Sequence, residues 1–161
     1  MFAAVLSLIK LLFMRPITTV LFFIITLAVS TGPVNAQCKV FAERICKVEL
    51  GSYVHDGNYH AAILSEGQEA ELYKTFHGGQ DYRLAICGDD NLPDIEFRVM
   101  DTDRNLLYTN RDDDYNITWD ISVESTEQLL ISVKVPAGEG NSQGGPESGC
   151  VAIMFGFREE E

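Results

Sequence analysis

The sequence predicts an all-β protein, an antiparallel β-sandwich or jelly roll of about seven to nine strands. From residue 70 onward the apolar residues recur at every second position, which is typical of strands with one buried face. Clusters of Gly, Asp and Asn separate these runs, as expected for tight turns between strands. A chain of 161 residues with 46% hydrophobic residues has enough apolar surface for one core and one domain.

The first 36 residues have the composition of an export signal. Two positive charges precede an apolar run, Ile17–Val29, and small or apolar residues end at Ala36. We therefore predict cleavage after Ala36, with Met14 as an alternative start. Because the run is shorter than the roughly 20 residues of a spanning helix, we expect no stable membrane anchor after cleavage. The mature chain is then a single domain, residues 37–161, in the periplasm or outside the cell.

The charge balance argues against nucleic-acid binding. Removing residues 1–36 takes away two basic and no acidic side chains, which changes the net charge from −12 to −14. A surface that neutralises phosphates needs clustered Lys and Arg. We expect no nucleic-acid partner for this acidic protein.

The first part of the mature domain predicts a short helix followed by a hairpin. Residues 37–50 form an amphipathic helix if Phe41, Ile45 and Val48 face the core. Asp-Gly within residues 54–60 then predicts a tight hairpin turn, with residues 61–64 continuing the second arm.

The later strands are predicted from their apolar residues. The runs contain Leu72 and Phe76; Tyr82, Leu84 and Ile86; Ile95, Phe97 and Val99; Leu107; Ile117, Trp119, Ile121 and Val123; Leu129, Ile131, Val133 and Val135; Val151, Ile153, Phe155 and Phe157. Turns are expected at residues 78–81, 88–91, 101–105 and 111–114. Trp119, the sole tryptophan, shares its parity with Ile117 and Ile121 and is predicted to face the core.

Four cysteines, an even number, follow the predicted cut: Cys38, Cys46, Cys87 and Cys150. In an exported chain this predicts two disulfides, and the absence of C-x-x-C argues against a redox motif. If residues 37–49 are helical, Cys38 and Cys46 lie about 12 Å apart along the axis and need partners elsewhere. If the segment is irregular, Cys38 bonds Cys46 and Cys87 bonds Cys150. We favour this second pairing, although the sequence alone leaves the pairing open.

No catalytic residue is assigned. Gly140-Asn141-Ser142-Gln143-Gly144 matches the G-x-S-x-G of a nucleophile elbow, which requires a strand before it and a helix after it. Pro146 prevents that helix, and no histidine follows Ser142 as the order of triad residues requires. We interpret the match as chance within a glycine-rich loop, residues 137–149.

No metal site is assigned either. His55 and His60 would face each other across the expected hairpin, but zinc needs further ligands, and nothing in the spacing brings His77 near. The series Asp101, Asp103, Asn105 and Asp112 resembles positions of a calcium loop, with Leu106 where that loop requires glycine. We interpret these acids as turn residues. A weak calcium site at the Asp-rich turns is left open.

Aromatic residues are the candidates for a binding face. If Trp119 faced solvent it would stack on a sugar or a peptide. Tyr53, Tyr59, Tyr73 and Tyr108 are the other candidates for such a face.

Residues 70–157 resemble the bacterial pre-peptidase C-terminal (PPC) domain, a small β-sandwich appended to secreted enzymes. The similar features are Tyr73 and Phe76 before Gly78-Gly79, residues 82–84, residues 94–101 leading into an Asp-rich turn, Trp119-x-Ile121, and residues 130–133. The resemblance implies a non-catalytic exported sandwich and carries no site residues across. The four cysteines and the missing turn glycine depart from that pattern.

These observations predict an exported, non-catalytic β-sandwich that acts as a binding module of the bacterial envelope or extracellular space. The expected partner is a protein or a carbohydrate, and no cofactor is expected. Two alternatives stay open: a small secreted hydrolase without a linear motif, and a structural subunit in which a sheet edge accepts a neighbour's strand. A deep pocket with histidines or carboxylates would favour the hydrolase, and charged edge strands would count against the subunit.

Overall fold

Two antiparallel sheets form the body of the protein in a computed structural model that describes residues 35–138 and 145–159. These residues belong to one unit, Val34–Glu161. The predicted sandwich and strand number are confirmed. The strands are β1 Val54–His55, β2 His60–Ser65, β3 Glu69–Phe76, β4 Gln80–Gly88, β5 Glu96–Met100, β6 Leu106–Thr109, β7 Thr118–Val123, β8 Glu127–Lys134 and β9 Ser148–Glu159.

The first sheet has the order β1-β9-β4-β7, and β2 also pairs with β9. The second sheet has the order β3-β8-β5-β6. The chain crosses from one sheet to the other between β2 and β3 through a turn at Gly67, whose φ of +81° suits glycine because it has no Cβ. One open side of the sandwich therefore lies between edge strands β2 and β3, and the other between β6 and β7.

The core between the sheets consists of most of the alternating residues that the sequence predicts. Leu107 and Ile117 are exceptions, because they are 51% and 41% exposed. Its largest fully buried side chains are Phe76, Phe97 and Phe155. Ile131 is fully buried and Ile153 is 8% exposed. Alternation works here because successive side chains of a strand point to opposite faces of the sheet.

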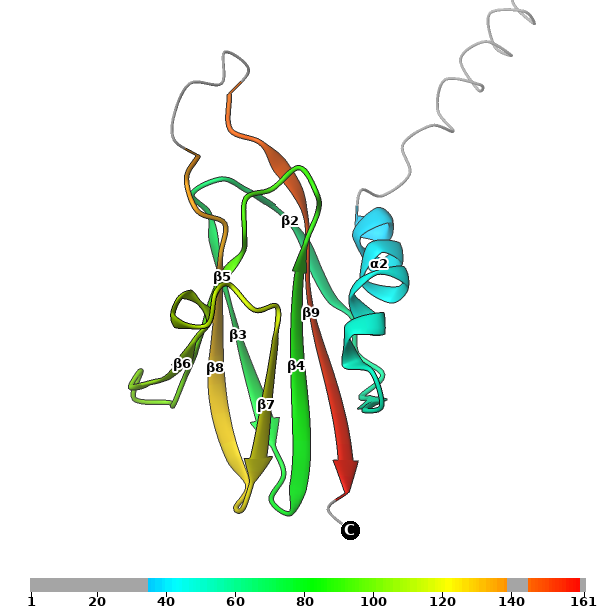
Figure 1. The fold of residues 1–161 in the computed structure, drawn as a ribbon, viewed down its shortest axis with the longest axis vertical. Helices are drawn as coiled ribbons and strands as arrows, with labels where there is room; N and C mark the ends of the chain where they lie inside the picture. Colours follow the sequence, from blue (N-terminus) through cyan, green and yellow to red (C-terminus); the bar gives the residue numbers. More distant parts are fainter. Residues whose placement is uncertain (1–34, 139–144, 160–161) are drawn as a thin grey trace, which may run out of the picture. The chain divides into compact units, whose positions relative to one another are not determined.

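A helical layer covers the outer face of the first sheet. It consists of helix α2, Asn35–Arg44, and the 3-10 helix η1, Cys46–Leu50; in Figure 1, α2 lies beside β2 and β9. β4 and β9 are consequently buried on both faces, with Ala85 and Met154 beneath the helices. No helix in the described part of the chain is long and apolar enough to cross a membrane.

The short N-terminal helix is confirmed, but the predicted apolar face is wrong. The buried residues are Cys38, Ala42, Cys46 and Leu50, whereas Ile45 and Val48 are 55% and 69% exposed. Phe41 packs only at the margin of the layer. The α-helix ends at Arg44, and the tighter 3-10 turn that follows changes the direction of later side chains.

The favoured disulfide pairing is also wrong. Cys38 bonds Cys150 and Cys46 bonds Cys87, with Cα–Cα distances of 5.2 and 5.6 Å. Because the segment is helical, Cys38 and Cys46 are too far apart to bond each other. Both disulfides instead connect the helical layer to the first sheet.

The predicted hairpin at residues 54–60 does not form. β1 and β2 do not pair with each other; both pair antiparallel with β9, His55 opposite Gly156 and His60 opposite Ile153. They therefore run in the same direction along one side of β9. Residues 56–59 form a loop between the two strands, and the Asp56 carboxylate accepts a hydrogen bond from the Asn58 N–H at 2.8 Å. An Asp-Gly pair here makes a local Asx turn and does not reverse the chain.

Candidate binding site

The two open sides of the sandwich are closed differently. Between β6 and β7, Tyr108 stacks on Trp119 with ring centroids 5.2 Å apart, and Phe97 contacts Tyr108 from the core. Trp119 packs against the core cluster as predicted. Between β2 and β3 no such pair exists within the described residues, and the side is hollow.

The hollow is a pocket of about 360 Å³, which we call the β2–β3 pocket. It is lined by Tyr59, His60, Ala61, Ala62, Leu64, Ala70, Glu71, Leu72, Val133, Val151 and Ile153. The large apolar residues of this set belong to the core or pack against it. The pocket therefore opens directly onto the apolar interior of the sandwich.

Two alanines account for the empty space. Ala62 lies opposite Val151 in the first sheet, and Ala70 lies opposite Val133 in the second. Since residues directly opposite each other share a face, both alanines point between the sheets. Protein interiors are close-packed, so methyl groups at two positions facing across a sandwich leave a void.

Part of the pocket wall is main chain. Ala61 and Glu71 line the pocket, yet the Ala61 side chain packs with the helical layer, and the Glu71 carboxylate accepts two hydrogen bonds from Arg104 at 2.8 and 2.9 Å. Both residues therefore contribute their backbone N–H and C=O groups to the walls. The pocket combines an apolar floor with polar strand edges.

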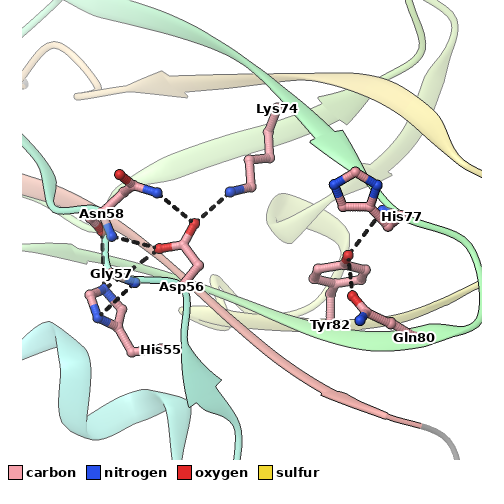
Figure 2. A network of polar contacts seen from close by, with 8 residues as sticks. All are labelled: His55, Asp56, Gly57, Asn58, Lys74, His77, Gln80 and Tyr82. Atoms are coloured by element: carbon pink, nitrogen blue, oxygen red, sulfur yellow. Dashed lines mark hydrogen bonds and ion pairs between the residues drawn. The ribbon is translucent and has the colours of Figure 1, made fainter.

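An ion pair between the sheets lies beside the pocket. Lys74 of β3 donates to the Asp56 carboxylate at 2.5 Å, and the Lys74 ammonium lies 4.9 Å from the centre of the Phe155 ring. Figure 2 shows Lys74 and Asn58 approaching the same carboxylate. Burial raises the pKa of Asp56, but the hydrogen bonds from Lys74 and Asn58 outweigh burial and leave that pKa below its ordinary value.

His60 lines the pocket, and His55 ends strand β1 just before the neighbouring loop. Burial lowers the pKa of His60, the charges of Lys74 and His55 act in the same direction, and Asp56 opposes them. The His60 ring packs edge-on against Phe155. His55 instead accepts a hydrogen bond from the Gly57 N–H at Nδ1, so its ring stabilises the loop of residues 56–59.

The three histidines do not form one site. His77 lies elsewhere, where its backbone N–H donates to the Tyr82 hydroxyl at 2.9 Å. Among the residues that the structure describes, no three His, Cys, Asp or Glu side chains are grouped as ligands for a metal ion. The predicted cross-strand arrangement of His55 and His60 is wrong because β1 and β2 are not partners.

The Asp-rich turns use their side chains locally. The Asp101 carboxylate accepts hydrogen bonds from the N–H groups of Asp103 and Asn105 at 2.9 and 2.8 Å. In the next turn the Tyr108 hydroxyl donates to Asp113 at 2.9 Å; burial and this hydrogen bond raise the pKa of Tyr108 to about 12. The interpretation of these acids as turn residues agrees with this geometry.

Residue Asn110 holds this second turn to the core, a role that the sequence did not indicate. The Asn110 side chain is fully buried, accepts from the Phe97 N–H and donates to the Ile95 carbonyl, each at 2.8 Å. Asn110 is thus a structural residue.

The candidate aromatic residues do not form one surface. Tyr73 is 50% exposed on the outer side of β3, whereas Tyr53 is 9% exposed and packs beneath the guanidinium groups of Arg83 and Arg158. Tyr59 belongs to the loop of residues 56–59 and lines the pocket, whereas Tyr108 stacks on Trp119 in the opposite side of the sandwich.

A second, smaller hollow of about 200 Å³ lies on the outer face of the first sheet. Its charged groups are engaged with one another: Arg83 bonds Asp120 with two hydrogen bonds of 2.7 Å, and Arg158 bonds Asp81 at 3.1 Å. These pairs satisfy their own charges across neighbouring strands, so this hollow offers little to a ligand.

Two sequence predictions fall outside the described residues. The export signal lies almost entirely before residue 35, and the G-x-S-x-G match with Ser142 lies in residues 139–144. Both stay predictions. The alanines of the β2–β3 pocket were missed, although Ala70 shares its parity with Leu72 and Phe76 in the sequence.

Comparisons with known proteins give limited similarity. No protein-family model matches the chain, and no curated protein matches it significantly. Among solved structures, the chain is similar to PliG from Aeromonas hydrophila, a periplasmic inhibitor of g-type lysozyme, with a TM-score of 0.47 and 12% sequence identity. The similarity covers 66% of this chain and 89% of the inhibitor.

Proposed function

We propose that this protein is an exported, non-catalytic binding protein and that the β2–β3 pocket is its binding site. The observation that carries the proposal is an open, mostly apolar pocket of about 360 Å³ whose wall includes the main chain of Ala61 and Glu71. Ligand sites in proteins are typically concave, mostly apolar and about 300–1,000 Å³ in volume, with a few polar groups that orient the ligand.

Export is supported by the two disulfides, because such bonds persist in oxidising compartments. Cleavage after Ala36 would leave Cys38 as the second residue of the mature chain. The Cys38–Cys150 bond would then hold the new N-terminus on the first sheet. We propose a periplasmic or extracellular location on these grounds.

A binding role is favoured over catalysis by the state of the polar groups. The Asp56 carboxylate bonds Lys74, and the Glu71 carboxylate bonds Arg104. General acid–base chemistry needs a positioned base within hydrogen-bond reach of the reacting proton. Both carboxylates near the pocket are instead bonded to basic side chains of the protein.

A pocket-filling variant tests the proposal. Ala70→Leu places a larger side chain between the sheets, whereas Thr75→Leu adds the same side chain on the outward face of the same strand. Binding is measured by calorimetry against glycans, peptides and secreted proteins, with g-type lysozyme as one member of the panel. We expect a ligand whose affinity falls about tenfold or more in Ala70→Leu and stays within about twofold in Thr75→Leu.

The opposite result would contradict the proposed site. If every ligand found binds Ala70→Leu as tightly as the unmodified protein, the β2–β3 pocket is not where binding occurs. Urea unfolding of each variant separates loss of the pocket from loss of the fold.

A further inference from the structure

The outer edge of β2 has backbone groups available for pairing. In the described residues, β2 pairs only with β9. The Glu66 N–H donates to the Glu147 carbonyl at 2.9 Å, and this pair continues the register of β2 and β9. Because hydrogen-bonded pairs recur at every second residue of an antiparallel ladder, the N–H and C=O groups of His60, Ala62 and Leu64 also face β9. Ala61 and Ile63 consequently direct their N–H and C=O groups outward.

The available stretch has defined ends. The outward groups of Ser65 are already bonded, since its N–H donates to the Gln68 side chain and its carbonyl accepts from the Gln68 N–H, at 2.8 and 2.9 Å. At the other end the loop of residues 56–59 interrupts the edge. The free part of the edge is therefore the part that borders the β2–β3 pocket.

β2 lacks the charges that usually protect a sheet edge. Its residues, His60–Ser65, include no Asp, Glu, Lys or Arg. β3 across the pocket carries Glu69 and Glu71, which pair with Arg98 and Arg104 on the outer face of the second sheet. Natural proteins place charges on edge strands to prevent strand addition, and β3 has this protection while β2 does not.

We propose that an extended segment of a partner polypeptide adds to the outer edge of β2 and inserts an apolar side chain into the β2–β3 pocket. This inference rests on the proposed function of the pocket as the binding site. In strand addition the main chain supplies hydrogen bonds, and pockets for alternate side chains supply specificity. Ala61 and Ile63 pair with the added strand, and the space left by Ala62 and Ala70 accepts its inward side chain.

Charge indicates what the segment contains. The mature chain has a net charge of −14, which opposes addition of a second copy of the same acidic protein. Glu66 and Glu147 lie together at the turn end of β2, and neither forms an ion pair within the described residues. The segment therefore combines an apolar anchor with at least one Lys or Arg.

The first experiment is a selection of random nine-residue peptides, displayed on phage, against the disulfide-bonded protein. We expect enriched peptides with apolar residues at alternate positions and a basic residue near one end. Their affinity should fall about tenfold in Ala70→Leu and in Ile63→Lys, which charges the edge, and should be unchanged in Val48→Lys on the exposed side of η1.

Methylation of peptide nitrogens then tests strand addition itself. Methyl groups on the alternate nitrogens that face β2 should reduce affinity about tenfold, because each removes a main-chain donor. Methyl groups on the intervening nitrogens should change it less than about threefold.

The outcomes distinguish the two proposals. If Ala70→Leu weakens binding while both methylated peptides bind equally, strand addition is wrong and the pocket remains the site. If Ala70→Leu has no effect, the proposed function fails as well. Enrichment of no peptide, with a small apolar molecule bound instead, would also overturn strand addition.

Discussion

Removal of each disulfide in turn measures how strongly the helical layer is held to the first sheet. The bonds close loops with sequence separations of 41 residues for Cys46–Cys87 and 112 residues for Cys38–Cys150. In the chain-entropy model these separations correspond to about 4 and about 5 kcal/mol of the free energy of unfolding. Replacement of each pair by alanine should therefore cost roughly these amounts, with the larger loss for Cys38–Cys150.

The assay is urea unfolding monitored by the fluorescence of Trp119, which packs against the core and reports on the sandwich. Reduction of the unmodified protein by dithiothreitol is the control, because it breaks the bonds and keeps the sulfur atoms in the buried cluster. Losses below about 1 kcal/mol for both pairs, or a larger loss for Cys46–Cys87, would show that loop closure does not set the contribution of these bonds.

Three further substitutions test the polar groups beside the core. Asn110→Ala leaves two buried backbone groups unpaired and should cost about 2–4 kcal/mol in urea unfolding; a loss below about 1 would contradict the assigned role. Asp56→Asn breaks the pair with Lys74 and should lower the free energy of unfolding by about 2 kcal/mol. Asp120→Asn breaks a more exposed pair with Arg83 and should lower it by less than about 1 kcal/mol. Equal losses would contradict the difference in burial. The pKa of His60 is lowered in the folded protein, so the unfolded chain binds the proton first, and the free energy of unfolding falls as the pH drops from about 7 to about 5. The variant His60→Gln should reduce this pH dependence. An unchanged dependence would exclude His60 as its source.

The sandwich could be predicted from the sequence because its core depends on a local pattern. Ile131 and Val133 alternate with polar or outward residues, and a strand period of two places them on one face whatever the partner strand is. Trp119 was assigned to the core by the same argument. Pairing between distant strands, such as β2 with β9, does not follow from this pattern.

The errors arose where a local signal competed with tertiary packing. Asp56-Gly57 suggested a hairpin, but β9 is long enough to pair with both β1 and β2, which are then collinear. Phe41, Ile45 and Val48 were predicted to form the buried face of the helix. The buried residues are instead Cys38, Ala42 and Cys46, which follow one another at intervals of four residues.

The β2–β3 pocket could not be predicted because it depends on two alanines that meet only in three dimensions. Ala62 and Ala70 are eight positions apart and belong to different sheets. Their spacing across the sandwich follows from the turn at Gly67, which the sequence analysis did not identify. The resemblance to the pre-peptidase C-terminal domain stays a prediction.

Strand addition to β2 is tested most sharply by mapping the bound peptide on the protein by nuclear magnetic resonance. The selected peptide is titrated into the isotopically labelled protein, and the backbone amide shifts are followed. We expect the largest changes at Ala61, Ile63 and Ala70, with the amides of Ala61 and Ile63 gaining protection from hydrogen exchange. Changes centred on β6 and β7 instead, with the amides of β2 unaltered, would contradict strand addition.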